Sequence, residues 1–395
     1  MKKTQKFLFS VFIIIFMFYI IKNPEISSEI VLKGLNLCYL VIIPVIFPFM
    51  IFSKMFINSM AFKFLGEILN KPARFLFGIS GEYANAFIIG CIMGFPMGAK
   101  TVKEVYLSNN INKNEAERTL AFCNNCSISF AVSAAGIMVF GSFKIGLYIF
   151  CIQLLSSIIT GIIIKFLFKE NTSNQEINEK IFESDKTSID FTEMISESVS
   201  GILNICGTVL FFYIATNVTL EFLKSAPFIS NLFEPEKHEI FYGLIESLLS
   251  GTFEISSGIY SLINFNIPMY YKLILSAIIL AWSGISVHFQ IMYILKDIDL
   301  SFKLYFTGKI IHVIISILTT AIFFRFINPT KISETFAWDF SFHSYYSGVN
   351  NLNTYTRGLI VTGIISLIMT LIIFIIAGIS CLLEKNKNSK KEVRK

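Results

Sequence analysis

Charged residues are scarce in this chain of 395 residues. Asp, Glu, Lys and Arg together make up 15% of it, whereas hydrophobic residues make up 54% and the mean hydropathy is +0.66. An average soluble domain carries about 25% charged residues. Because the apolar residues also gather in long runs, this composition excludes an ordinary soluble protein and indicates a membrane protein.

The common catalytic motifs are also missing. The chain has no His-Glu-x-x-His zinc motif, no Gly-x-Ser-x-Gly nucleophile turn and no phosphate-binding loop. Cys123 and Cys126 have the C-x-x-C spacing of a redox pair or half a metal site, but no second pair and no neighbouring histidine pair accompanies them. We therefore expect no enzyme activity, no cofactor and no metal, and interpret the cysteines as small buried hydrophobic residues.

The apolar runs predict membrane-spanning helices. A helix crosses a bilayer with about 20 apolar residues, and we find no run of alternating residues typical of a membrane strand. The clear runs are 7–21, 146–168, 202–215, 304–327 and 359–383. We predict an all-α polytopic membrane protein with roughly six to ten spans.

Basic residues indicate how the chain is oriented. Lys2, Lys3 and Lys6 precede the first apolar run, and the tail 385–395 is also basic. Because basic flanks stay on the cytoplasmic side, we expect both termini in the cytoplasm. The net charge of +6 gathers at helix ends and in the tail, so the expected surroundings are a lipid bilayer and no nucleic acid. A homo-oligomer stays open.

One long hydrophilic stretch, 169–190, divides the chain. We predict an N-terminal span and outside loop at 1–34 and a first membrane repeat unit at 35–168. A hydrophilic linker and interfacial helix are expected at 169–200. The second membrane repeat unit, with the basic tail, is expected at 201–395.

Two segments place glycines and polar residues where hydrocarbon is expected, at 90–129 and 251–290. A membrane protein tolerates broken helices only where they are buried in protein or line a wet cavity. The segments are offset by about 160 residues and repeat the same spacing between two polar motifs. They predict two repeat units with broken or re-entrant helices around a transport site. Whether the repeats are inverted stays open.

The first segment offers candidate substrate-binding residues. Its glycines and proline expose backbone groups, and a helix starting near Ser127 would offer N–H groups to a carboxylate. Lys100 adds a cation, and the buried amides need partners. The alternatives are close helix packing, an interface anchor at Lys100 and a purely structural amide network. The candidates are Gly94, Pro96, Gly98, Lys100, Asn124, Asn125 and Ser127.

The second segment contains an acidic residue and a histidine. A carboxylate inside a span costs about 2.5–3.5 kcal/mol unless it is paired or hydrated, so Glu254 is a functional candidate by default. His288 can change its charge near neutral pH. The alternatives are an interface position for Glu254 and a merely hydrogen-bonded His288. The candidates here are Glu254, Ser257, Ser283, Gly284, Ser286, His288 and Gln290.

At these motifs the chain resembles a known family. GFPMGAK (94–100), FCNNCSIS (122–129), EISSG (254–258) and SGISVHFQ (283–290) resemble sporulation integral membrane proteins of the YlbJ/SpoVV type. These belong to the wider nucleoside-recognition, or Gate, domain group. The resemblance covers roughly 35–383. One departure is that Cys126 and Ser127 follow the Asn pair, where the family often has Gly or Pro.

The resemblance implies a transporter of a small organic anion. Family members are associated with dipicolinic acid, which passes toward the forespore across the outer forespore membrane, so the resemblance implies this substrate. Two half-helix N-termini, near Ser127 and Ser286, would then each face one carboxylate. Other hypotheses stay open: a carrier for a nucleoside or another small metabolite, and a non-transporting scaffold in spore assembly. An intramembrane enzyme is the least supported, since no catalytic motif is present.

Overall fold

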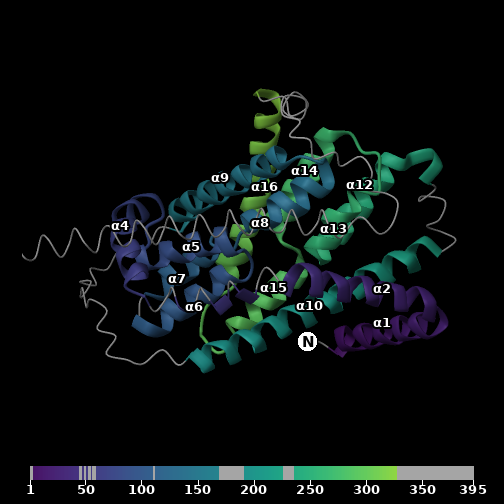
Figure 1. Cartoon of the computed structure of the whole chain (residues 1–395), viewed down its shortest axis with the longest axis horizontal. Coiled ribbons are helices and arrows are strands. Elements are labelled where there is room, and N and C mark those ends of the chain that lie inside the picture. Colours follow the sequence, from purple (N-terminus) through teal and green to yellow (C-terminus); the bar gives the residue numbers. More distant parts are fainter. Residues whose placement is uncertain are drawn as a thin grey trace, which may run out of the picture.

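The computed structural model describes residues 3–43, 59–109, 112–168, 191–225 and 235–326, with a few positions between 47 and 55. Within these ranges the chain forms helices and no strand (Figure 1), which confirms the predicted all-α fold. The stretch 169–190, the apolar run 359–383 and the basic tail lie outside the described residues.

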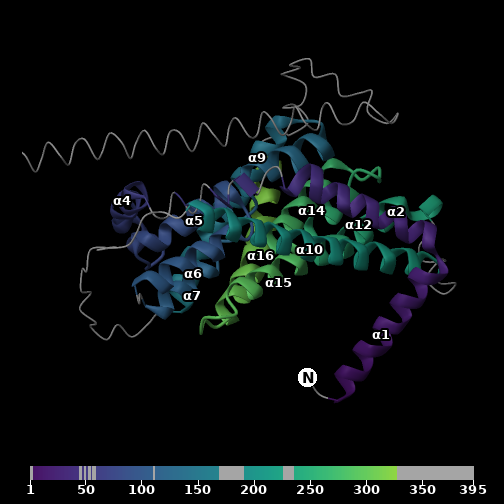
Figure 2. The ribbon, with the colours of Figure 1, turned by 60° about the horizontal axis from the view of Figure 1, so that its bottom comes forward.

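Two N-terminal helices replace a loop that the sequence predicted. Helix α1 (Lys3–Lys22) is followed by Asn23 and then by α2 (Pro24–Leu37), so the expected outside loop before residue 35 is helical. Proline suits the first turn of α2 because no N–H is needed there. The π-helical turn η1 (Cys38–Ile42) continues α2. Figure 2 shows α1 extending away from the other helices.

The part of the chain before the hydrophilic stretch is here called the first half. After α1, α2 and η1 its described residues contain the single helix α4, two interrupted helices and one long helix. The helices are α4 (Met60–Leu76), α5 (Gly81–Met93), α6 (Met97–Asn109), α7 (Lys113–Leu120), α8 (Ile128–Phe130) with its π-helical continuation η2 (Ala131–Val139), and α9 (Phe143–Leu167). Helices α4 and α5 meet at an angle of 94°.

The second half has the same order of elements. Its helices are α10 (Phe191–Ser225), α12 (Pro235–Phe253), α13 (Ile255–Ser261), α14 (Met269–Trp282), α15 (Gly284–Ile294) and α16 (Lys303–Phe326). In both halves a pair of interrupted helices precedes a long apolar helix, α9 or α16.

Helix α10 corrects one predicted boundary. The sequence predicted a separate interfacial helix ending at residue 200, but α10 runs without a break from Phe191 to Ser225. No proline falls inside this range, and the two glycines, Gly201 and Gly207, do not end a helix that packs against its neighbours. The polar start of α10 is therefore the first part of a long membrane helix.

Four helical segments among the described residues are long and apolar enough to cross a membrane, or five if the bent α4–α5 pair counts as one span. The four segments are Phe143–Leu167, Phe191–Phe222, Met269–Ile294 and Lys303–Arg325. This is fewer than the predicted six to ten, a number that also counted the run 359–383 outside the described residues.

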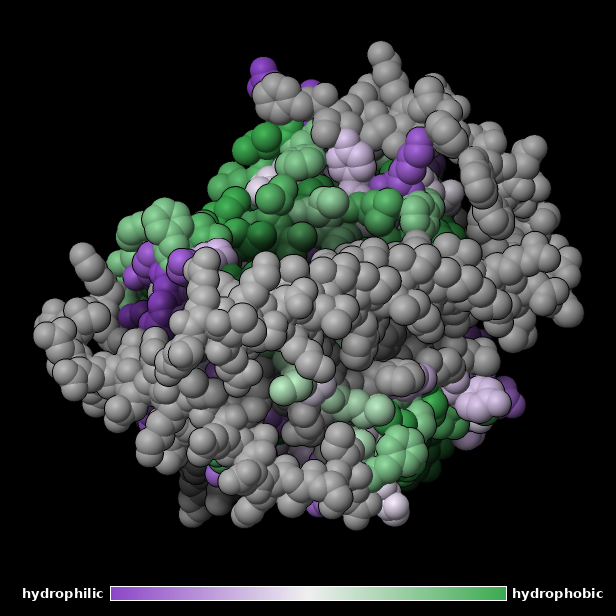
Figure 3. Space-filling model, turned by 60° about the vertical axis from the view of Figure 1, so that its left-hand side comes forward, coloured by the Kyte–Doolittle hydropathy of each residue, from purple (hydrophilic) through white to green (hydrophobic). Residues whose placement is uncertain are grey.

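The two faces of α16 fit a membrane environment. Its exposed face carries an apolar stripe, and its buried face carries polar side chains. The exposed residues are Ile310, Ile314, Leu318 and Ile322, and the buried ones are Lys309, His312, Ser316 and Thr320. Apolar side chains also cover much of the described surface seen in Figure 3. This arrangement is the reverse of that in a soluble helix, and it is typical of a helix with lipid outside and a polar site inside.

Candidate functional site

Four helix breaks form the candidate site, two in each half. In the first half, residues 94–96 separate α5 from α6, and residues 121–127 separate α7 from α8. In the second half, Glu254 separates α12 from α13, and Ser283 separates α14 from α15. Helices α14 and α15 together still form one long span, interrupted at a single residue.

The two breaks of the first half are in direct contact. Gly94 has a φ of +81°, and a Cβ built on it would lie 2.9 Å from the backbone nitrogen of Ser127. The Asn124 side-chain oxygen accepts a hydrogen bond from the backbone N–H of Ala99, at 2.8 Å. Asn124 therefore satisfies an N–H in the first turn of α6, a group that the helix itself leaves unpaired.

The two breaks of the second half are also in contact. Gly284 has a φ of +78°, and a Cβ built on it would lie 3.0 Å from the backbone nitrogen of Ile255. Ser283 has a φ of 78° as well, which is uncommon for a residue other than glycine. The close approach explains why a glycine stands at 284.

Lys309 on α16 joins the breaks of the two halves. Its ammonium donates to the backbone oxygen of Asn124 at 2.7 Å and to the Ser283 hydroxyl at 2.8 Å. The backbone oxygen of Ala281 lies 3.3 Å away. The Lys309 side chain is only 1% exposed. The buried Lys309 ammonium thus forms hydrogen bonds with the second break of each half, 121–127 and Ser283.

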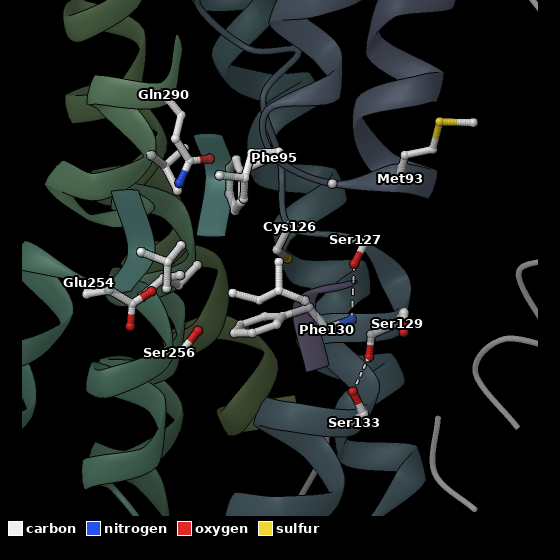
Figure 4. Close-up of a pocket in the computed structure, with 16 residues that line it drawn as sticks. Met93, Phe95, Cys126, Ser127, Ser129, Phe130, Ser133, Glu254, Ser256 and Gln290 are labelled. Atoms are coloured by element: carbon white, nitrogen blue, oxygen red, sulfur yellow. Dashed lines mark hydrogen bonds between the residues drawn. The ribbon is translucent and has the colours of Figure 1, made fainter. Parts of the chain in front are cut away.

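A pocket of about 90 Å³ lies between the halves. Cys126, Ser127 and Phe130 come from the first half, and Glu254 and Gln290 face them from the second (Figure 4). Further lining residues are Gly94, Phe95, Ser129, Ser133 and Ser256. The pocket therefore combines apolar walls with a few polar groups, as small-molecule sites do.

Two short helices begin at this pocket. The Ser127 hydroxyl accepts the backbone N–H of Phe130 at 3.1 Å and so caps α8, as the sequence predicted for a helix starting there. The Glu254 carboxylate accepts the backbone N–H of Ser257 at 2.7 Å and caps α13. The second predicted N-terminus, near Ser286, is that of α15, which begins at Gly284; neither residue lines the pocket. The N-caps of α8 and α13, Ser127 and Glu254, both line the pocket.

Glu254 is completely buried, with 0% of its surface exposed. One carboxylate oxygen caps α13, and the other has no hydrogen-bond partner among the described residues. The same holds for the hydroxyls of Ser257 and Ser286 and for the side-chain oxygen of Asn125. Buried polar atoms are normally satisfied by protein, water or a ligand, so these atoms mark places where a polar solute or water gains hydrogen bonds.

The structure brings most of the sequence-predicted residues to this region, in different roles. Gly94, Ser127, Glu254 and Gln290 line the pocket. Asn124 and Ser283 hold Lys309.

The other candidates lie at or beside the breaks without lining the pocket. Pro96 is in the first break, and Gly98 packs against the backbone oxygen of Cys123. Asn125 donates to the backbone oxygen of Phe122 at 3.0 Å, so it supports the turn. Lys100 on α6 is half-buried.

His288 lies in an aromatic cluster. Its Nδ1 is 2.6 Å from the Tyr305 hydroxyl, and its ring packs edge-on against Trp282, with centroids 4.6 Å apart. A contact with the ring of Phe306 completes the cluster. His288 does not occur among the described residues that line the pocket. The cluster fixes the His288 ring, which matches the alternative interpretation of a hydrogen-bonded histidine.

Sequence reasoning missed Lys309. It lies inside the apolar run 304–327, and its partners are backbone oxygens and a hydroxyl far away in the chain. A usable signal was present, since Tyr305, Lys309, His312 and Ser316 recur at helical spacing and mark one polar face of that span.

The described residues contain no group of three or more side chains able to hold a metal ion. Cys123 and Cys126 are free, buried thiols. Hydrogen bonds and close backbone packing connect the breaks in the described part of the chain.

Comparison with known proteins gives one informative similarity. No family model matches the chain, and no solved structure matches it. The chain is 24% identical over 337 residues to the sporulation integral membrane protein YlbJ of Bacillus subtilis (strain 168). The aligned region covers 79% of this chain and 81% of that protein. At modest identity but over most of both chains, this similarity supports a YlbJ-type sporulation integral membrane protein.

Proposed function

We propose that the chain is a transporter that carries a small organic anion, dipicolinic acid in the first place, through the membrane around the forespore. The observation that carries the proposal is that three of the four helix breaks line one pocket between two similarly ordered halves, while the fourth, at Ser283, lies beside the Glu254 break through the close approach of Gly284 to Ile255. Broken helices that face each other across repeat units are the usual construction of a transporter binding site.

The pocket offers features that suit an aromatic dicarboxylate. Ser127 lies at the N-terminus of α8, where backbone N–H groups favour a carboxylate. Phe95 and Phe130 provide apolar surfaces for a planar ring. Lys309 adds a positive charge behind Phe95, with its Nζ 5.0 Å from the ring centroid.

Glu254 sets a condition on anion transport. An ionised carboxylate in the pocket repels an anionic solute, and the described residues that line the pocket include no Lys or Arg to offset this negative charge. An anion therefore binds best when Glu254 holds a proton. In this proposal the anion and a proton enter the site together.

The pocket is too small for such a solute in the conformation described. A volume of about 90 Å³ has room for about three water molecules. The two halves must separate for dipicolinate to bind. Movement of one half against the other around a central site is how repeat-built transporters alternate their access.

The placement in the cell completes the proposal. The similarity to a sporulation integral membrane protein supports a membrane of the sporulating cell. The family resemblance implies the outer forespore membrane, and the basic flanks favour both termini in the cytoplasm of the mother cell. Fluorescent fusions and protease accessibility of tagged termini in sporulating cells measure both points. A protected terminus on the intermembrane side would contradict the orientation.

Uptake into proteoliposomes tests the function. Purified protein is reconstituted, and entry of labelled dipicolinate is measured against empty liposomes. An excess of unlabelled dipicolinate should abolish the uptake, a simple dicarboxylate should compete weakly and a nucleoside should not compete. No uptake above empty liposomes under any proton gradient would contradict transport and favour a scaffold.

A nucleoside carrier is the second candidate. The described residues that line the pocket include Ser, Gln and Glu side chains but no Lys or Arg. Such a lining also suits a neutral solute that forms hydrogen bonds. Competition by a nucleoside, with none by dicarboxylates, would support this second function over the first.

A further inference from the structure

Lys309 lies where three of the four helix breaks meet. Its ammonium contacts the oxygens of Asn124 and Ser283, and the ring of Phe95 lies beside it. None of the ion pairs found among the described residues involves Lys309. A buried ammonium is costly unless its surroundings compensate it, so the surrounding dipoles must do so.

The oxygens around the ammonium come from the end of a helix and from two breaks. Ala281 is the next-to-last residue of α14, Asn124 lies in the break that follows α7, and Ser283 contributes its hydroxyl. The last carbonyls of a helix have no partner within the helix and carry partial negative charge. Carbonyls at the ends of broken helices are also the groups that bind the coupling sodium ion in other repeat-built transporters.

The fold brings Lys309 close to this oxygen set. Its neighbour Gly308 packs against the backbone of Ala121, where a Cβ on residue 308 would lie 2.7 Å from the Ala121 Cβ. Any larger residue at 308 would push α16 away from the break at 121–127. Gly308 thus allows the approach that puts the Lys309 ammonium 2.7 Å from the Asn124 oxygen.

We propose that the Lys309 ammonium is a resident cation that occupies a monovalent-cation site formed by the oxygens of Asn124, Ala281 and Ser283. The side chain supplies the positive charge that a dissociable ion supplies elsewhere. The consequence for coupling rests on the proposed transport function: transport runs without sodium. The cation site itself does not depend on that function.

Removing the side chain should open the site to a free cation. Lys309→Ala is purified in detergent, and its melting temperature is measured with sodium, ammonium or methylammonium chloride against choline chloride at equal ionic strength. We expect a saturable rise in the melting temperature of Lys309→Ala with at least one small cation, since an ion that binds only the folded state stabilises it. Wild type should show no such rise.

Lys309→Met is the matched control, because methionine fills the space with an unbranched side chain and brings no charge. It should be destabilised like Lys309→Ala but should not respond to small cations. Equal responses of Lys309→Ala, Lys309→Met and wild type would overturn the proposal.

Wild-type measurements keep the test decisive if Lys309→Ala does not fold. Saturable stabilisation of the wild type by sodium, or uptake that needs sodium, would overturn the resident cation while leaving transport intact. Cation-specific stabilisation of Lys309→Ala together with no uptake by wild type would support the site and reject the transport function. Equal uptake in sodium and choline is the expected result.

Discussion

The fully buried Glu254 carboxylate caps α13, since one of its oxygens lies 2.7 Å from the backbone nitrogen of Ser257. Its other oxygen is unpaired within the described residues and the side chain lines the pocket. Glu254 therefore caps α13 and, in the proposed function, also carries the proton. Substitutions at 254 can distinguish the capping role from the proton-carrying role.

Glu254→Gln should make dipicolinate uptake less dependent on pH. Glutamine resembles the protonated acid, keeps an oxygen able to accept the Ser257 N–H and cannot release a proton. Uptake is measured in proteoliposomes across a pH series, with and without a proton gradient. Glu254→Ala is the comparison, and loss of the cap should lower the unfolding free energy by about 1 kcal/mol. A Glu254→Gln variant with the same pH profile as wild type would reject the proton-carrying role.

Ser127→Asp should distinguish an anionic substrate from a neutral one. Asp caps a helix as well as Ser does, so α8 should remain intact. The added carboxylate in the pocket should lower dipicolinate uptake by at least about tenfold, because two charges about 4 Å apart interact by about 4 kcal/mol at an effective dielectric constant of 20. Uptake of a nucleoside should change little.

Ser127→Thr is the control for this experiment, because it keeps the cap and adds only a methyl group. Thermal unfolding verifies that both variants are folded. Unchanged dipicolinate uptake by a folded Ser127→Asp variant would speak against an anion site at α8.

Ser286→Ala should lower uptake without loss of stability. Ser286 is completely buried, and its hydroxyl has no partner among the described residues, so its removal leaves no protein group unpaired. Ser276→Ala and Ser316→Ala are matched controls, since their hydroxyls are also buried without a described partner. If all three variants transport like wild type, Ser286 has no part in the site.

Sequence reasoning located the breaks because each is marked locally. Gly94 and Pro96 interrupt a helix, Ser127 is a good N-cap, and Glu254 is conspicuous in an apolar stretch. These signals depend on the type of residue within a few positions. The start of α8 at Ile128, directly after Ser127, follows from them.

The contacts between breaks were beyond the reach of sequence reasoning. Lys309 binds oxygens of residues 185 and 26 positions away in the chain, and two of the three contacts are to the backbone, which any residue type supplies. Sequence reasoning selected Lys100 instead, because it follows the glycines in sequence. Lys100 does not line the pocket, whereas Glu254 and Gln290 of the second half do. Residue type marks a break, but only the packing of the helices decides which breaks meet.

Gly94→Ala should destabilise the protein more than Gly141→Ala. Gly94 has a φ of +81° and a ψ of −169°, a region that essentially only glycine occupies, so alanine costs about 1–3 kcal/mol there for its backbone conformation alone. Gly141 has a φ of +64°. A Cβ at 94 also meets the Ser127 backbone, whereas a Cβ at 141 meets nothing within 4 Å. The difference between the two variants in thermal unfolding therefore reports the glycine-only backbone conformation at 94 together with the contact between the two breaks of the first half. If Gly94→Ala and Gly141→Ala unfold at the same temperature, those breaks do not pack together as described here.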